Sequence, residues 1–297
     1  MLVIVKGNFR VQLLKHSVNP IGEEAITFFW TYERFIHAEV MTHRTFSRNY
    51  SSSRAIPYER MMEWVGKDPA NHLHLGSNQA GMVSGKEVDN ADTLRSDIAL
   101  KFFEMREWCD SLVDKYNPHK EVINRYTEPW GWITGMATMG RRAFMNFISL
   151  RCSRGANPNI QRVAISCLRL YKSSVPQQLE YMQWHTPFFD DYIPHGLVSD
   201  SNVRVGLIWS GARSAWCSYN NPTKDATFEK AQIRHDDCVK FKHVTPLEHP
   251  LQARNDGKAH GLVPGYNSYR SMIPGESVED LNIDEILADY GDRDYIL

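Results

Sequence analysis

The hydrophobic residues near the start of the chain follow the pattern of two β-strands and then the spacing of a helix. Residues 9–18 and 25–32 are rich in β-branched and aromatic side chains, and a stretch containing proline and glycine separates them. This pattern predicts two strands joined by a turn. Apolar positions in residues 33–43 fall at helical spacing, so we predict a short helix there.

The rest of the pattern predicts a mostly helical chain with one further buried strand. Pro57 suits the first turn of a helix, and residues 67–92 are polar with Gly, Asn and Pro, which indicates a long connection. Helical periodicity predicts helices at 93–116, 119–126, 141–151, 158–170 and 226–243, and residues 130–140 are typical of a buried strand. We expect a single domain over residues 1–297, with a peripheral acidic tail from about residue 276.

Composition excludes several classes of protein. The chain has 297 residues, of which 42% are hydrophobic and 23% charged, as in ordinary soluble globular proteins. The formal net charge of -1 provides no basic field for duplex nucleic acid, so any anion site must be local. We expect no signal peptide and no membrane span, because no apolar run approaches the roughly 20 residues that a span needs. The five cysteines are odd in number and form no CxxC pair, which favours reduced thiols in a cytoplasmic protein and no metal site.

The most distinctive stretch covers residues 41–57 and has the sequence MTHRTFSRNYSSSRAIP. It contains three arginines and four serines but no carboxylate. Arginine presents a planar fork that matches phosphate oxygens, and serine hydroxyls add further donors. Ser52, Ser53 and Arg54 could therefore hold a phosphate group, although a solvated loop would have a similar composition.

Two further segments carry candidate chemistry. Arg142, Asn146 and Arg151 recur at roughly helical spacing in residues 141–151, which is also compatible with an ordinary helix surface. Residues 243–249, HVTPLEH, combine two histidines with a glutamate. The spacing differs from HExxH and no third ligand is evident, so a zinc site is not expected.

Taken together, these segments resemble the flavin-dependent thymidylate synthases. The Arg-His-Arg signature of that family, followed after seven residues by Ser, is similar to Thr42-His43-Arg44 with Ser52. The family's helix ending NFLNLR resembles residues 146–151, its HxSPFEH segment resembles 243–249, and its ARVSY segment resembles 215–219. In familiar members the last two segments precede the Arg-His-Arg segment, whereas here they follow it, so the chain resembles a longer branch with rearranged motifs.

The resemblance implies an α+β fold with an antiparallel sheet flanked by helices, and a homotetramer whose sites draw residues from several subunits. The implied enzyme is a methyltransferase flavoprotein that converts dUMP to dTMP. FAD is the implied cofactor, methylenetetrahydrofolate supplies the carbon and NADPH reduces the flavin. No nucleic-acid partner is implied.

Site residues can be carried over position by position. Arg151 is the implied catalytic residue, a cation beside the pyrimidine. The implied substrate-binding residues are Glu39, Ser52, Ser53, Arg54, Arg125 and Arg151. The implied FAD contacts are His43, Arg44, Asn49, Arg142, Asn146, Ser218, His243, Thr245 and Glu248.

Three positions depart from the family pattern and leave alternatives open. Thr42 replaces the first arginine of the signature, Tyr50 a common glutamate, and Gly155 a common histidine. Each change removes a polar contact, so the enzyme could instead hydroxymethylate its substrate, or act on UMP or dCMP. A non-enzymatic protein that binds single-stranded nucleic acid through arginines and aromatics is the alternative of another class, although the near-neutral charge disfavours it.

Overall fold

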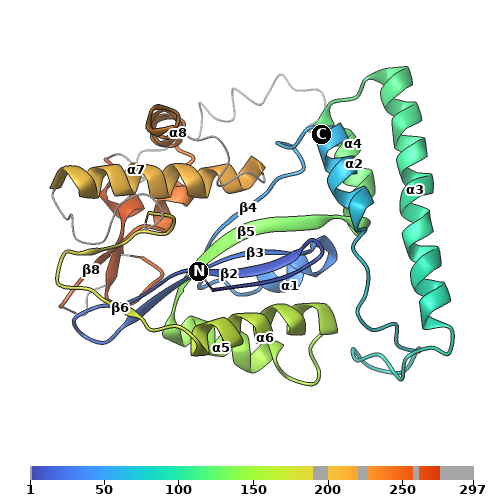
Figure 1. Ribbon diagram of the computed structural model, residues 1–297, viewed down its shortest axis with the longest axis horizontal. Coiled ribbons are helices and arrows are strands. Elements are labelled where there is room, and N and C mark those ends of the chain that lie inside the picture. Colours follow the sequence, from blue (N-terminus) through green and yellow to red (C-terminus); the bar gives the residue numbers. More distant parts are fainter. Residues whose placement is uncertain (1, 190–199, 220–226, 257–260, 275–297) are drawn as a thin grey trace, which may run out of the picture.

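The computed structural model describes residues 2–189, 200–219, 227–256 and 261–274, and it is built on an antiparallel sheet (Figure 1). The strand order is β1-β2-β3-β5-β4, and a short β6 pairs in parallel with β2. The bounds are β1 (Leu2–Lys6), β2 (Phe9–Val18), β3 (Glu24–Glu33), β4 (Ser47–Tyr50), β5 (Trp132–Gly140) and β6 (Gln177–Gln178). The strands predicted at 9–18, 25–32 and 130–140 are confirmed, and so is the α+β class. Strand β4, inside the segment predicted to be a loop, was not anticipated.

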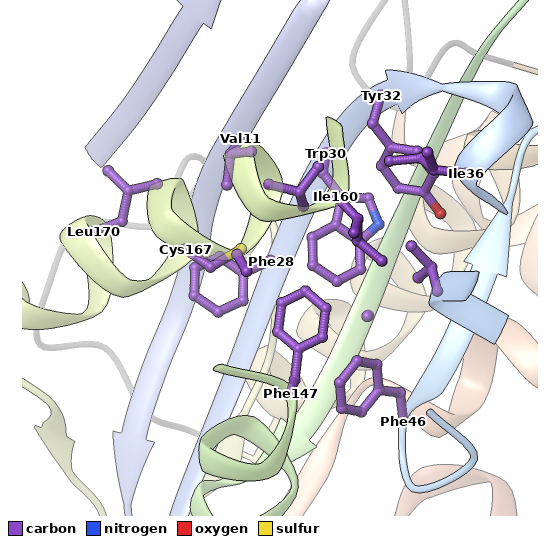
Figure 2. Packing of buried hydrophobic residues seen from close by; sticks show 14 of the residues in the cluster. Val11, Phe28, Trp30, Tyr32, Ile36, Phe46, Phe147, Ile160, Cys167 and Leu170 are labelled. Atoms are coloured by element: carbon purple, nitrogen blue, oxygen red, sulfur yellow. The ribbon is translucent and has the colours of Figure 1, made fainter. Parts of the chain in front are cut away.

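One face of the sheet is covered by α5 (Arg141–Arg151) and α6 (Pro158–Lys172). Phe28 and Trp30 of β3 point to this face and pack with Phe147, Ile160 and Cys167 from the helices (Figure 2). Alternate residues of a strand point to opposite faces, so Phe29 lies on the other side in a separate cluster. Both helices begin and end within two residues of their predicted bounds.

The opposite face carries the C-terminal part of the chain. It contains α7 (Asp200–Trp216), η3 (Cys217–Tyr219), α8 (Phe228–Lys240), η4 (Thr245–Glu248) and η5 (Tyr269–Met272), with a small sheet of β7 (Trp184–His185), β8 (Leu251–Ala253) and β9 (Tyr266–Ser268). A buried polar chain joins this part to the main sheet. Thr138 Oγ1 lies 2.7 Å from Thr27 Oγ1 and 2.9 Å from Nδ1 of His249, and Thr27 Oγ1 lies 2.8 Å from Nε2 of His185. The HVTPLEH segment is thereby fixed to the sheet.

A third group of helices packs around its own small core at the far end of the sheet (Figure 1). It comprises α2 (Tyr58–Lys67), α3 (Ala91–Tyr116), α4 (Lys120–Ile123) and η2 (Asn124–Trp130). The helix predicted at 119–126 is thus an α-turn that continues as a 3-10 helix through Pro129. The helix predicted at 33–43 is also divided, into η1 (Arg34–Ile36) and α1 (His37–Met41).

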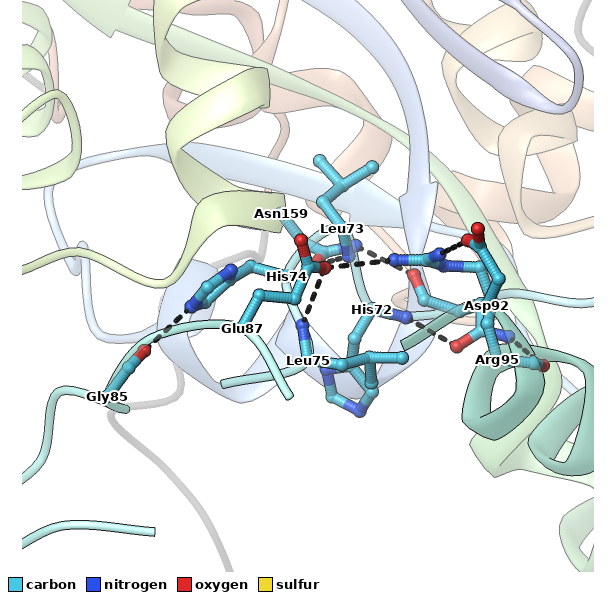
Figure 3. A network of polar contacts seen from close by, with 10 residues as sticks. His72, Leu73, His74, Leu75, Gly85, Glu87, Asp92, Arg95 and Asn159 are labelled. Carbon is cyan, nitrogen blue, oxygen red and sulfur yellow. Dashed lines mark hydrogen bonds and ion pairs between the residues drawn. The ribbon is translucent and has the colours of Figure 1, made fainter. Parts of the chain in front are cut away.

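The long connection predicted at 67–92 exists and is anchored by polar contacts (Figure 3). Arg95 pairs with Asp92 at 2.8 Å and with Glu87 at 3.4 Å, while the amide of Leu73 donates to Oδ1 of Asn159 at 3.1 Å. Across the described residues, no helix is both long and apolar enough to cross a bilayer. The acidic tail predicted from about residue 276 lies outside the described residues.

Candidate functional site

Arg151, the last residue of α5, reaches across to the turn that follows α1. Its Nε donates to Nε2 of His43 at 3.0 Å, and its Nη2 donates to the carbonyl of Glu39 and to Oγ1 of Thr42, both at 3.0 Å. Nη1 lies 3.3 Å from Oε2 of Glu39. Four of the five N–H donors of a guanidinium are therefore engaged by the protein, which holds this cation in one orientation.

His43 is a buried, neutral acceptor in this arrangement. Its ring is stacked on Phe46 and meets the edge of Phe147, with centroids 5.5 and 5.0 Å away. Burial, together with the nearby positive charges of Arg151 and Arg48, lowers the pKa of His43 to about 4. Because Nε2 accepts from Arg151, the neutral ring carries its proton on Nδ1.

The SSSR segment forms a turn that is held on both sides. The amide of Ser52 donates to the carbonyl of Ser218 at 3.0 Å, which joins the turn to η3. Nδ2 of the buried Asn124 donates to the carbonyls of Ser53 and Ile56 at 2.8 and 2.9 Å. The backbone is thus fixed, while Ser52 is half-buried and Arg54 is exposed.

Arg54 and Arg125 meet at one residue of α4. Nε of Arg54 lies 2.8 Å from Oε1 of Glu121, and Nε of Arg125 donates to the backbone carbonyl of the same residue at 3.1 Å. These two implied phosphate ligands therefore both contact Glu121. The carboxylate paired with Arg54 was not expected, since the segment from 41 to 57 contains none.

A cavity of about 600 Å³ lies between β4, η3, α8 and η4. Four of the implied FAD contacts line it, namely Asn49, Ser218, His243 and Thr245. Nδ2 of Asn49 also donates to the carbonyl of Ser214, which connects β4 to α7. Protein cavities of roughly 300–1,000 Å³ are typical of small-molecule sites, and this lining offers amide, hydroxyl and imidazole groups beside aromatic rings.

One wall of the cavity was missed by reasoning from the sequence. It is formed by α8 and its end, through Arg234, Asp237, Cys238 and Phe241, and by Tyr219 of η3. The α8 residues are spaced three, four and seven apart from Arg234, which places them on one helix face. That spacing, directly before the HVTPLEH segment, was the signal that could have identified them.

Other implied FAD contacts lie outside this cavity. Arg44, Arg142 and Asn146 are exposed on α5 and on the turn after α1. Glu248 is turned toward Arg270, with 2.5 Å between Oε1 and Nη1. One chain thus brings together only part of the implied flavin set.

The three departures from the family pattern have different surroundings. Thr42 accepts a hydrogen bond from Arg151, so its hydroxyl supports that cation. Tyr50 packs at the edge of the main core, and burial raises the pKa of its hydroxyl to about 12. Gly155 is exposed, and an added Cβ would have 4.0 Å to its nearest atom, in Val83.

One comparison with known proteins identifies a family. Residues 12–177 match the model of the Thy1 family, described as thymidylate synthase complementing protein. The sequence matches no curated protein. Part of this chain is also similar to two solved structures of PolB, a UMP/dUMP methylase from Streptomyces cacaoi. The one bound with 5-Br UMP has 17% identity and a TM-score of 0.45, over 58% of this chain and 92% of the other. The one bound with 5-Br dUMP has 20% identity and a TM-score of 0.40, over 50% and 65%.

Proposed function

This chain belongs to the Thy1 family of thymidylate synthase complementing proteins, and we propose that it catalyses the FAD-dependent reductive methylation of dUMP at C5. The product would be dTMP, the carbon would come from methylenetetrahydrofolate, and NADPH would be the reductant. The observation that carries the proposal, beyond the family, is the cavity itself. Side chains implied as flavin contacts come from β4, η3 and η4, far apart in sequence, and they line one hollow.

The residues present fit a bound flavin. Asn49, Ser218 and Thr245 offer hydrogen bonds, and Tyr219 and Phe241 offer flat apolar surface. When bound there, FAD would supply the hydride that completes the transferred methyl group. Nine residues are proposed to hold it; four of them line this cavity, and Arg44, Arg142 and Asn146 would act from the surface.

Arg151 is the proposed catalytic cation. Uracil C5 is a weak nucleophile, so a fixed positive charge near the pyrimidine would stabilise the charge that develops as C5 attacks. The four hydrogen bonds to residues 39–43 orient this cation before substrate arrives, so little reorganisation is required during the reaction. Glu39, whose carboxylate and carbonyl both contact Arg151, would support this cation and also bind the substrate.

Phosphate binding is proposed at the SSSR turn. Ser52, Ser53 and Arg54 would hold the 5′-phosphate with help from Arg125, and the fixed backbone lowers the entropy lost on binding. Because one chain leaves its implied flavin residues in two places, we propose that the complete site forms between subunits of a homotetramer. A reducing, cytoplasmic setting suits the five free thiols.

The test combines the flavin spectrum of the purified protein with identification of the product. A purified protein with a flavin spectrum excludes the alternative of a nucleic-acid-binding module. Incubation with labelled methylenetetrahydrofolate, NADPH and either dUMP, UMP or dCMP then identifies the nucleotide and separates methyl from hydroxymethyl products. Colourless protein with no labelled product from any nucleotide contradicts the proposal.

A further inference from the structure

We propose that Glu121 competes with the nucleotide phosphate for Arg54: its carboxylate forms an ion pair with Arg54 until a phosphate displaces it. This inference rests on the proposed function, since it assumes that Arg54 holds the 5′-phosphate. It adds a residue that determines how strongly the site binds phosphorylated ligands.

The contacts of residue 121 are the basis of this inference. Its carboxylate lies 2.8 Å from Nε of Arg54, and its carbonyl accepts from Nε of Arg125 at 3.1 Å. The preceding residue, Lys120, donates from Nζ to the carbonyl of Ala55 at 3.0 Å. Lys120 and the carboxylate of Glu121 thus lie against the turn that carries Arg54, and Arg125 is bonded to the backbone of Glu121. In this arrangement the carboxylate takes the role of an anionic ligand for Arg54.

The SSSR turn is joined to the α4–η2 segment by hydrogen bonds to the backbone of the turn, so only side chains need to move when a phosphate replaces Glu121 at Arg54. Asn124, 1% exposed, bonds the carbonyls of Ser53 and Ile56, so the η2 segment that follows α4 and the turn form one unit. Arg54 can therefore leave Glu121 by rotation of its side chain while the backbone stays in place.

The exposure of the pair makes it weak enough to exchange. The side chains of Arg54 and Glu121 are 63% and 38% exposed, and ion pairs in contact with water contribute little to stability. A phosphate dianion forms stronger, charge-assisted bonds to arginine. When the phosphate binds, Glu121 loses its ion pair with Arg54, and its carboxylate also repels the negatively charged phosphate. Both effects weaken phosphate binding.

The experiment compares Glu121→Gln with the wild-type protein by calorimetry, using dUMP and deoxyuridine. Glutamine keeps the size and the backbone carbonyl but removes the charge. We expect dUMP to bind about three- to tenfold more tightly, whereas the affinity for deoxyuridine stays the same. Glu63→Gln is the matched control, because Glu63 forms an exposed pair with Lys67 at 2.7 Å on α2. It should leave both affinities unchanged.

The variant Arg54→Ala separates failure of this inference from failure of the proposed function. If Arg54→Ala weakens dUMP binding but Glu121→Gln leaves it equal or weaker, the competitor role is wrong and the phosphate site stands. If Arg54→Ala leaves dUMP binding intact, the phosphate assignment itself is wrong. If both the phosphate site and the competitor role are correct, Glu121→Gln should tighten dUMP binding much less in the Arg54→Ala protein than in the wild type. Without Arg54 there is no ion pair to displace, and only the repulsion between the Glu121 carboxylate and the phosphate remains to be removed.

Discussion

Nε of Arg151 donates to Nε2 of His43 at 3.0 Å, so the end of α5 and the turn after α1 are joined through a buried, neutral imidazole. This contact makes the orientation of the proposed catalytic cation depend on a residue that the resemblance implied only as a flavin contact.

The first prediction concerns that contact. His43→Leu removes the acceptor of Nε, one of the four hydrogen bonds that orient Arg151. We therefore expect kcat to fall about tenfold while the KM for the nucleotide changes little. His43→Gln retains an acceptor near the position of Nε2 and should recover much of the rate. Steady-state kinetics of both variants, with flavin content measured in parallel, provide the check. Equal rates for leucine and glutamine would show that the hydrogen bond is unimportant.

The second prediction is a loss of stability in acid. Burial lowers the pKa of His37 and His43 to about 4 and that of His249 to about 3. When the pH falls below the ordinary histidine pKa of about 6.5, these rings become protonated in the unfolded chain but stay neutral in the folded chain. The free energy of unfolding should therefore fall between pH 6.5 and 4, by up to about 1.4 kcal/mol per pH unit for each such histidine.

Urea unfolding across this pH range measures that slope. His43→Gln removes one titrating ring. The slope of its unfolding free energy against pH should therefore be smaller by up to about 1.4 kcal/mol per pH unit, which corresponds to one proton. A wild-type curve that is flat from pH 6.5 to 4 would contradict the neutral, buried state of these rings.

The third prediction is that flavin binding depends on two separate surfaces. His243→Ala alters the cavity, and Arg44→Ala alters an exposed position that a neighbouring subunit would complete. Each should weaken FAD binding about tenfold or more, as loss of a charge-assisted or aromatic contact does. Lys230→Ala, at the exposed start of α8, is the control. Retention of FAD by Arg44→Ala alone would restrict the flavin site to the cavity of one chain.

The fourth prediction is that neither Cys152 nor Cys217 is the nucleophile. Cys217 is fully buried, burial raises the pKa of its thiol, and its Sγ donates to the carbonyl of Arg213 at 3.6 Å. Burial also raises the pKa of Cys152. Cys152→Ser and Cys217→Ser should keep turnover within about threefold of wild type, since weakly ionised thiols are poor nucleophiles. Abolished turnover in a folded Cys152→Ser protein would instead indicate covalent catalysis.

The fifth prediction tests the packing of β4 on β5. Gly135 lies opposite Tyr50, and a Cβ at Gly135 would overlap the tyrosine ring and lie 2.7 Å from the carbonyl of Asn49. Gly135→Ala should therefore destabilise the fold by about 1–3 kcal/mol. Tyr50→Ala removes the ring that a Cβ at position 135 would overlap but leaves the contact with the Asn49 carbonyl. Tyr50→Ala should therefore lower the free energy of unfolding less in the Gly135→Ala protein than in the wild type. Thermal unfolding of the two single variants and the double variant measures this coupling.

Most of the main sheet and its covering helices could be predicted because their signals are local. The β-branched and aromatic composition at 9–18 and 25–32, and the helical spacing at 141–151 and 158–170, depend only on neighbouring residues. Strand β4 gave no such signal. Its four residues, Ser47–Tyr50, are polar or aromatic, and they form a strand only because β5 offers an antiparallel partner.

The site shows the same division. Residue types alone suggested that Ser52, Ser53 and Arg54 could hold a phosphate, because an arginine fork has the same chemistry wherever it lies. Arg125 and Arg151 were proposed only through the resemblance to the family. Residues 41–57 contain no carboxylate, but the fold brings the carboxylate of Glu121, on α4, into contact with Arg54. Likewise the strand alternation of β4 turns Asn49 to the cavity and Tyr50 to the core. Which charges meet, and which side of a strand faces the ligand, depend on contacts between distant segments, and only the folded chain specifies those.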